Sequence, residues 1–379
     1  MEKVRLGSQI KQIRGVSYKP TDLHNDLNDS SVILLRANNI SDGKLNFDDV
    51  VYVDKSKVKE EQYLKKGDIL VCASSGSKEL VGKAAFVKKD FTATFGAFCK
   101  LIRPMGCIAE YLGHYFNSPT YREKISALAL GANINNIRNE HIDELFVCFP
   151  NELEQKSIAS LLDKVTNLID KRKEQLSKLD ELAKARFVEL FGNGHDGKTT
   201  VKMLGSICKF QQGTQIPVEE QFEEQNAGYK RFLRIIDYTQ APQPPRYVNV
   251  NGKEVDEKSV VIVRYGATAG FVGRGYQGIL ANNLFEIMPD ETILSKEFLF
   301  LALKYGTFEK EVHDKAFGAA MPALSFSMMN DIPVVVPMPE QQSKFVCFVE
   351  QTDKSKLEVQ KSLEKLELLK KALMQKYFG

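Results

Sequence analysis

Two stretches of this chain repeat one junction: LFVCFPNELEQKSI at 145–158 and IPVVVPMPEQQSKF at 332–345. Each begins with a short run of apolar, β-forming residues, passes a proline and acidic residues, and enters a sequence with helical periodicity. Pro150 and Pro337 separate the strand from the helix in each copy. Acidic residues suit a helix start because its unpaired amides favour negative charge. The sequence therefore predicts the same strand-to-helix junction twice, 187 residues apart.

The junction belongs to a longer internal repeat. Residues Gly131–Gly192 align without a gap to Gly318–Gly379, and the start of each repeat is also similar, with VRLGSQI at 4–10 and VKMLGSI at 201–207. The middle parts of the two repeats differ far more than these ends do. This contrast indicates that the ends share one role while the middle parts do different work.

Each repeat follows the same plan. Its first part contains short β-rich runs separated by Gly, Asn and Ser clusters, such as GDILVCA and FCKLIRP in the first repeat and VVIVRY and LFEIMP in the second. A helical stretch follows in each, at 109–130 and 296–317. The repeat then ends in a long helix of roughly 33 residues, which would span ~50 Å.

Apolar residues in the long helices follow the three-and-four spacing of a coiled-coil seam. The seam residues are Ile158, Leu162, Val165, Ile169, Leu176 and Leu179 in the first helix, and Phe345, Val349, Val359, Leu363, Leu366, Leu373 and Tyr377 in the second. Neither helix is expected to leave this stripe in water, and two equivalent helices in one chain most simply pack against each other. An antiparallel pair would place the two β-rich domains at opposite ends.

The predicted fold class is therefore α+β: two β-rich globular domains separated by an antiparallel coiled coil of two long helices, with a pseudo-twofold internal repeat. The expected boundaries are a first domain at 1–150, a first long helix at 151–192, a linker at 193–200, a second domain at 201–337 and a second long helix at 338–379.

Composition limits the class of protein. A chain of 379 residues with 43% hydrophobic and 27% charged residues is typical of globular domains, and its length suits two of them. No apolar run is long enough for a membrane span, and the start carries no export signal, so a cytoplasmic location is expected. The six cysteines and five histidines are scattered, which favours buried free thiols and gives no support for a metal site.

One apparent catalytic motif is rejected. The stretch GNGHDGKT at 192–199 satisfies the phosphate-loop pattern GxxxxGK[ST], but a working phosphate loop leaves a strand and enters a helix. Here a helix precedes the stretch and a strand follows it, and Gly192 is expected to be a helix C-cap. The sequence also lacks the glycine-rich dinucleotide fingerprint, HExxH, GxSxG and NPPY-like motifs. The chain is interpreted as a non-enzymatic reader or scaffold.

The duplicated arrangement resembles the specificity (S) subunits of type I restriction-modification systems. The resemblance rests on GANINNIRNEHIDELFVCFPNELEQKSIASLLDKV and GAAMPALSFSMMNDIPVVVPMPEQQSKFVCFVEQT, and on the turns GDILVCASSGS and RYGATAG. It covers nearly the whole chain in the expected order. Two features depart from the family pattern: the Glu-Gln pair shifts by one position between the copies, and the tryptophan common near each repeat start is absent.

The resemblance implies a DNA-binding subunit with no catalytic activity of its own. Each variable domain would read one half of a split double-stranded DNA target, and the helices would set the gap and dock the methyltransferase subunits. It also implies restriction (motor-nuclease) subunits in the full complex, no membrane partner, and no cofactor on this chain. S-adenosylmethionine, ATP and Mg are expected on the partner subunits.

Polar and basic residues in turns are the candidates for DNA contact, because Lys and Arg bind phosphates and Arg, Asn, Gln, Ser and Thr read base edges. The candidates are Arg36, Asn38, Asn39, Ser74, Ser77, Lys78 and Lys83 in the first repeat, and Thr214, Gln215, Lys230, Arg231, Arg234, Arg264, Tyr265, Thr268 and Arg274 in the second. A solvated turn explains any one of them as well. Arg36 and Arg234 occupy matching places, which either a DNA contact or a structural salt bridge explains.

Two other functions stay open at this point. One is a scaffold whose modules bind proteins through the helices and never contact DNA. The other is the specificity subunit of a related system in which the methyltransferase carries its own nuclease.

Overall fold

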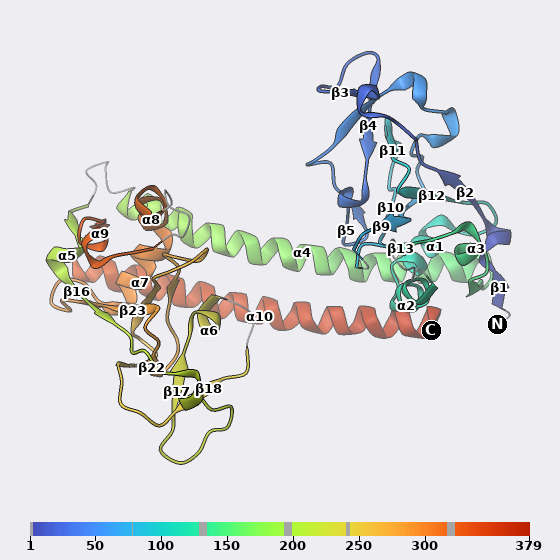
Figure 1. Ribbon diagram of the computed structural model, residues 1–379. Coiled ribbons are helices and arrows are strands. Elements are labelled where there is room, and N and C mark those ends of the chain that lie inside the picture. Colours follow the sequence, from blue (N-terminus) through green and yellow to red (C-terminus); the bar gives the residue numbers. More distant parts are fainter. Residues whose placement is uncertain (1–2, 78, 129–134, 193–198, 240–242, 317–322) are drawn as a thin grey trace. The chain divides into compact units, whose positions relative to one another are not determined.

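The computed structural model describes residues 3–77, 79–128, 135–192, 199–239, 243–316 and 323–379 (Figure 1). The chain divides into two compact units. The first unit contains Met1–Lys173 and Lys361–Gly379, and the second contains Glu174–Gln360. Each unit therefore takes one β-rich domain and a part of both long helices. The predicted linker at 193–200 lies almost entirely outside the described residues.

Two four-stranded sheets form the larger part of the β structure in the first unit. One has the order β10-β8-β12-β2 and the other β11-β4-β7-β3. The strands are β2 (Ile10–Arg14), β3 (Leu23–His24), β4 (Ser31–Leu35), β7 (Val51–Asp54), β8 (Ile69–Cys72), β10 (Ala84–Phe86), β11 (Ala93–Phe95) and β12 (Cys99–Pro104). A short pair, β1 (Lys3–Arg5) with β14 (Phe146–Cys148), precedes the long helix.

The second unit repeats this plan. Its sheet β16-β23-β20-β21 corresponds strand by strand to β2-β12-β8-β10, and β15 pairs with β24 as β1 does with β14. In the other sheet, β17 pairs in parallel with β22, as β4 does with β11. The strands are β15 (Val201–Met203), β16 (Cys208–Gln212), β17 (Lys230–Leu233), β18 (Arg246–Val248), β19 (Glu254–Val255), β20 (Val260–Val263), β21 (Val272–Gly273), β22 (Gly278–Leu280), β23 (Leu284–Pro289) and β24 (Pro333–Val335).

Each helical stretch expected before the junction is in fact two short helices. The first unit has α1 (Ala109–Phe116) and α2 (Pro119–Leu128), and the second has α7 (Lys296–Tyr305) and α8 (Phe308–Ala316). Pro119 stands at the first position of α2, and the Ser118 hydroxyl accepts a hydrogen bond from the Tyr121 amide at 3.2 Å. In the second unit Gly306 follows the last residue of α7. In each unit these capping residues end one helix and start the next. The apolar periodicity alone predicts one continuous helix there.

The long helices exceed the roughly 33 residues estimated from the apolar seam and fall within the expected bounds of 151–192 and 338–379. Helix α4 runs from Glu152 to Phe191 and helix α10 from Pro339 to Phe378, and each has 40 residues. Each begins two residues after the proline of its junction. Gly192 adopts a left-handed conformation with φ of 70°, so it caps α4 as predicted and does not open a phosphate loop.

Parts of both long helices complete the core of the first unit. Ala159 and Leu162, near the start of α4, share one buried cluster with Met374 and Phe378, near the end of α10. Farther along α4, Lys173 Nζ lies 3.8 Å from Glu367 Oε1. In this unit, residues later in α4 therefore contact residues earlier in α10. The two helices run in opposite directions.

The second unit has the corresponding arrangement. Ala183, Phe187 and Phe191 of α4 are buried with Phe345 and Val349 of α10. The ring centroids of Phe187 and Phe191 each lie 5.5 Å from that of Phe345. The spacing analysis found Phe345 and Val349 but missed the three α4 residues, because they lie beyond the last leucine that fitted the seam.

A buried glutamine fixes the repeated junction in each unit. In the first, Gln155 Nε2 donates to the Pro150 carbonyl at 2.8 Å, and its Oε1 accepts from the Ile108 amide just before α1 at 3.0 Å. In the second, Gln342 Nε2 donates to the Pro337 carbonyl at 2.9 Å, and its Oε1 accepts from the Ser295 amide just before α7 at 3.0 Å. The shared glutamine thus joins the start of the long helix to the start of a preceding helix.

Replacing Gln155 with alanine is expected to lower the free energy of unfolding by ~1–3 kcal/mol, because the half-buried Ile108 amide would lose its acceptor. Urea denaturation followed by circular dichroism measures this change. Glu154→Ala, an exposed change one residue away, is the control and should cost far less. Equal losses in the two variants would show that the glutamine has no special role.

Candidate nucleic-acid interface

The two units present a matching pair of turns at the ends of their central strands. The Ala73 amide donates to the Phe98 carbonyl at 2.9 Å, and the Ile137 amide donates to the Ala73 carbonyl at 2.8 Å. In the second unit the Arg264 amide donates to the Asn283 carbonyl at 2.9 Å, and the Leu324 amide to the Arg264 carbonyl at 2.9 Å. The same backbone frame therefore carries different side chains in the two units.

Arg36 and Arg234 occupy matching places, and each is held by its own unit. The Arg36 amide donates to Asn39 Oδ1 at 2.8 Å, and the Arg234 amide donates to Asp237 Oδ2 at 2.9 Å. The guanidinium of Arg36 lies 3.1 Å from Asp49, and that of Arg234 lies 3.1 Å from Asp237. Of the two explanations that the sequence left open, this geometry supports the structural salt bridge.

Asn38 and Asn39 are also engaged within the fold. Asn38 Nδ2 donates to Asp49 Oδ2 at 2.7 Å. Asn39 is buried, and its Nδ2 donates to the carbonyls of Asn46 at 3.0 Å and Asp49 at 2.8 Å. Asn39 therefore shapes the turn after β4 and does not face a ligand.

Two further basic candidates begin strand β17. Lys230 forms an ion pair with Glu254. Arg231 Nη2 lies 3.1 Å from Asp237 Oδ1, and its guanidinium lies 4.4 Å from the centroid of the Tyr276 ring. Asp237, whose side chain is fully buried, therefore binds both Arg231 and Arg234.

Three candidates lie on or near the turn after β20. Arg264 Nε donates to the Leu324 carbonyl at 3.3 Å, and its guanidinium lies 4.7 Å from the centroid of the Tyr265 ring. Tyr265 is 37% exposed. Arg274 lies over Phe300, 4.3 Å from the ring centroid. The cation-and-ring pair of Arg264 and Tyr265 is suited to stacking on a base.

The remaining candidates fall into two groups. Thr214 Oγ1 accepts from the Lys253 amide at 2.8 Å, and Gln215 Oε1 accepts from Asn282 Nδ2 at 3.3 Å. Thr268 lies in the tight turn between Gly266 and Gly270, whose φ angles are 88° and 89°. In the first unit Ser74 is half-buried in β9 (Ser74–Ser75) opposite Asn136, Ser77 is exposed and Lys83 is half-buried. Lys78 lies outside the described residues.

The sequence analysis missed an exposed aromatic residue on the same frame. Phe98 is 70% exposed, although its carbonyl accepts hydrogen bonds from the amides of Ala73 and Ser74. The preceding Gly96 amide donates to the Leu35 carbonyl at 2.9 Å. A rigid backbone therefore holds a large apolar ring in solvent, where a nucleic-acid base could stack on it.

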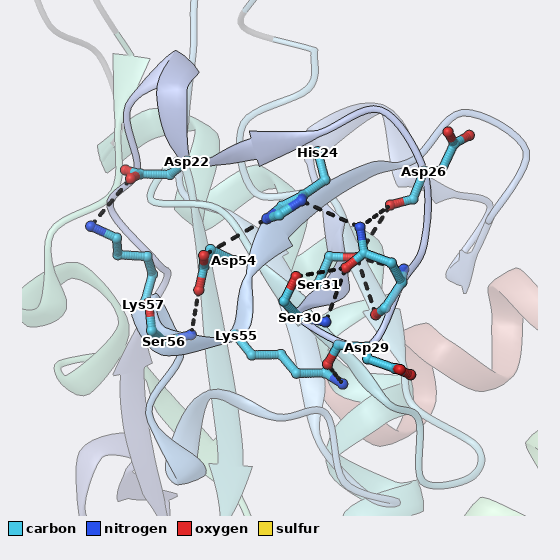
Figure 2. Close-up of polar contacts among 11 residues, drawn as sticks. Asp22, His24, Asp26, Asp29, Ser30, Ser31, Asp54, Lys55, Ser56 and Lys57 are labelled. Carbon is cyan, nitrogen blue, oxygen red and sulfur yellow. Dashed lines mark hydrogen bonds and ion pairs between the residues drawn. The ribbon is translucent and has the colours of Figure 1, made fainter.

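The charged residues near β3 and β7 bind one another instead (Figure 2). Lys57 Nζ lies 3.2 Å from Asp22, and His24 Nε2 lies 3.8 Å from Asp54. Lys55 Nζ donates to the Asp29 carbonyl at 2.8 Å. The Lys19 amide and then Lys57 lower the pKa of Asp22 through hydrogen bonds. This edge of the first unit therefore offers paired charges to a partner.

The thiols differ in how deeply they are buried. Cys72, Cys99 and Cys208 are buried, as expected, and burial raises the pKa of Cys72 to about 11 and that of Cys208 to about 12. Cys107 and Cys148 are half-buried, and Cys347 is exposed, which the sequence did not predict. In the described part of the chain, no group of three or more His, Cys, Asp or Glu side chains could hold a metal. No helix among the described residues has the length and apolarity to cross a bilayer.

Comparison with known proteins identifies the family. The type I restriction modification DNA specificity domain matches residues 3–181 and 197–368, so it covers both repeats. The chain belongs to this family. The resemblance noted in the sequence is thus confirmed.

Two specificity subunits of type I restriction enzymes are among the relatives. The type I restriction enzyme EcoKI specificity subunit of Escherichia coli K12 is 40% identical over 191 residues, which are 50% of this chain and 41% of that protein. The StySPI specificity subunit of Salmonella potsdam is 42% identical over 173 residues, which are 45% of this chain and 37% of that protein. Each match thus spans about two fifths of the relative's length.

A solved structure supports the fold of the whole chain. The S subunit of a type I restriction-modification system from M. genitalium has a TM-score of 0.60 at 18% identity, and the match covers 100% of this chain and 96% of that one. The mixed helix and strand fold is therefore that of known S subunits.

Proposed function

We propose that this chain is the non-catalytic, sequence-reading subunit of a type I restriction-modification complex, and that its two units each read one half of a split DNA target. The observation that carries the proposal is the matching pair of turns. One backbone frame, built twice, presents Ser74 and Phe98 in the first unit and Tyr265 and Asn283 at the same positions in the second. Two readers of this kind would recognise different bases with a common geometry.

The two long helices act in this proposal as an antiparallel coiled coil that sets the distance between the half-sites. Its support is that each helix is continuous for 40 residues and supplies buried side chains to the core of both units. The internal repeat gives the arrangement its pseudo-twofold character. The gap between the half-sites would then be fixed in length and free in sequence.

Partners and cofactors follow from the same proposal. The helices dock methyltransferase subunits, which bind S-adenosylmethionine, and motor-nuclease subunits join the full complex with ATP and Mg. This chain binds none of these cofactors itself and works in the cytoplasm. Between 152 and 191 the first helix has eight basic and eight acidic residues, a balance that suits a protein partner better than a phosphate backbone.

Sequencing the methylated bases of a host that expresses this chain with its methyltransferase tests the proposal. The expected result is one split motif with a gap of constant length. Methylation of an uninterrupted motif would contradict the proposal that each unit reads one half of the DNA target. Methylation by the isolated chain would contradict its non-catalytic role.

A protein scaffold is the alternative from a different class. Titration of duplex binding with salt separates the two, because contact with phosphates releases counterions and makes affinity fall steeply as salt rises. A scaffold would show no such dependence. Whether the nuclease is a separate subunit or is fused to the methyltransferase is decided by which subunits purify with this chain.

Replacing Phe98 with alanine is expected to weaken binding of the first half-site about tenfold, because stacking of a base on an aromatic ring contributes ~1–3 kcal/mol. The free energy of unfolding should stay nearly unchanged, since the ring is 70% exposed. Fluorescence anisotropy on a duplex with the methylated motif measures binding, and Leu27→Ala, a change at another exposed apolar residue of this unit, is the control. Unchanged affinity for Phe98→Ala would remove this ring from the interface.

A further inference from the structure

A polar cluster lies on one face of the first unit's sheet. Lys100 on β12 donates from Nζ to Asn139 Oδ1 at 2.6 Å and lies 3.5 Å from Gln12 Oε1. Gln12 belongs to β2, and Asn139 begins helix α3 (Asn139–Asp143). Gln12 Nε2 also donates to Asp143 Oδ1 at 2.8 Å. We call Gln12, Lys100 and Asn139 the polar trio.

The second unit has three phenylalanines at the same positions. Phe210 on β16, Phe285 on β23 and Phe326, which begins helix α9 (Phe326–Asn330), correspond to Gln12, Lys100 and Asn139. Their ring centroids are 5.4–6.3 Å apart. The strand register matches too, since Gln212 faces Phe285 where Arg14 faces Lys100. The fold therefore accepts an apolar cluster at this place and does not require a lysine.

Lys100 lies in an unfavourable electrostatic setting. Arg14 is directly opposite it on β2, and like charges facing each other across two strands destabilise a sheet. Burial of the amine and then the charge of Arg14 lower the pKa of Lys100 to about 8. Glu140 and Asp143 of α3 act in the opposite direction but do not cancel these effects. A bound anion would relieve the repulsion between the two cations.

The surroundings point to a phosphate within a nucleic acid. Arg14 is exposed, so it can reach a ligand in solvent. Phe98 precedes Lys100 by two residues along the chain and lies in the turn that leads into β12. Lys100 and the exposed ring thus come from one short segment of the first unit, and Arg14 faces Lys100 from the neighbouring strand. A cation pair beside an aromatic ring suits a nucleotide, with its phosphate on the cations and its base on the ring.

We propose that Arg14 and Lys100 bind one backbone phosphate of the DNA half-site read by the first unit, an inference that rests on the proposed function. The second unit, with its three phenylalanines at the same place, makes no such ionic contact. The two units therefore differ in how strongly salt and pH affect their binding.

The test compares the full chain in complex with its methyltransferase subunits with its Lys100→Met and Arg14→Gln variants, on a fluorescein-labelled duplex of mixed sequence. Loss of one phosphate contact reduces the salt slope by about 0.9, so a fourfold rise in salt should weaken wild-type binding about 3.5-fold more than binding by either variant. Lys11→Gln is the control, because Lys11 is on the same strand as Arg14 but alternates to the opposite face and pairs with Glu61.

A pH series adds a second readout. A DNA phosphate favours the charged form of the Lys100 amine. Where this amine is partly neutral in the protein without DNA, it therefore takes up a proton when DNA binds. Affinity should therefore fall by up to about tenfold more for the wild type than for Lys100→Met from about pH 7 to about pH 9. Circular dichroism should show that Lys100→Met is folded, since the second unit carries phenylalanine at this position.

The outcomes separate the two proposals. Salt slopes and pH profiles of Lys100→Met and Arg14→Gln that equal those of Lys11→Gln would overturn the phosphate site, while salt-dependent binding by the wild type would leave the reader function intact. No salt-dependent binding by the wild type would overturn the reader function itself. Inorganic phosphate that competes with the duplex only in proteins with both Arg14 and Lys100 would support the site directly.

Discussion

Replacing Phe378 with alanine is expected to lower the free energy of unfolding of the first unit by ~3–5 kcal/mol. The ring is 7% exposed, and its centroid lies 5.1 Å from that of Tyr111 and 5.8 Å from that of Tyr115. These partners lie on α1, more than 250 residues earlier in the chain. Loss of the ring removes buried apolar surface and leaves a cavity among aromatic side chains. Both changes lower the free energy of unfolding.

Hydrogen exchange of the α1 amides measures this effect within the first unit, because local protection reports the free energy of opening. Leu368→Ala is the matched control on the same helix, since Leu368 is 68% exposed, and it should change protection by no more than ~0.5 kcal/mol. Protection of α1 that is equal in the two variants would show that α10 does not complete the core of the first unit.

Replacing Asp237 with alanine is the second change with a large expected effect, a loss of ~3–5 kcal/mol from the second unit. Asp237 binds Arg231 and Arg234 and caps the turn after β17 through the Arg234 amide. Its removal leaves two partly buried cations without their partner. Binding of the second half-site should fall with the loss of this turn, while the first half-site is still recognised.

Asp237→Asn separates the charge from the cap. The first unit has Asn39 at the corresponding position, where the side-chain oxygen accepts from the Arg36 amide. Asparagine at 237 should therefore keep the turn, lose the ion pairs, and destabilise the second unit less than alanine does. Chemical denaturation and binding to duplexes altered in one half-site at a time measure both effects. Equal losses from the two substitutions would show that the charge of Asp237, and not the cap, stabilises the turn.

Much of the fold could be predicted because the chain contains its own comparison. The gap-free repeat placed the strand-to-helix junctions and the Gly192 cap correctly. Periodicity failed where a cap interrupts it: Ser118 with Pro119, and Gly306, divide each expected helical stretch in two. It also missed Phe187 and Phe191, because they are buried against Phe345, which belongs to a helix far away in the sequence.

The interface was harder to predict than the fold. Arg36, Arg231 and Arg234 look available in the sequence, but Asp49 and Asp237 bind them through contacts that residue type alone does not reveal. Phe98 was overlooked because an apolar residue beside a strand suggests a core position. The polar trio became visible only when the strand register placed Gln12, Lys100 and Asn139 together. A strand-by-strand alignment of the two repeats could have shown that phenylalanine replaces each of them.

Selection of bound duplexes from a random-sequence library, with the full chain in complex with its methyltransferase subunits, tests the central claim most directly. The account predicts two short blocks of base preference separated by a gap of constant length with no preference. It also predicts that Asp237→Ala alters one block only. A single continuous block, or a change in both blocks from that one substitution, would contradict the reading of DNA by two separate units.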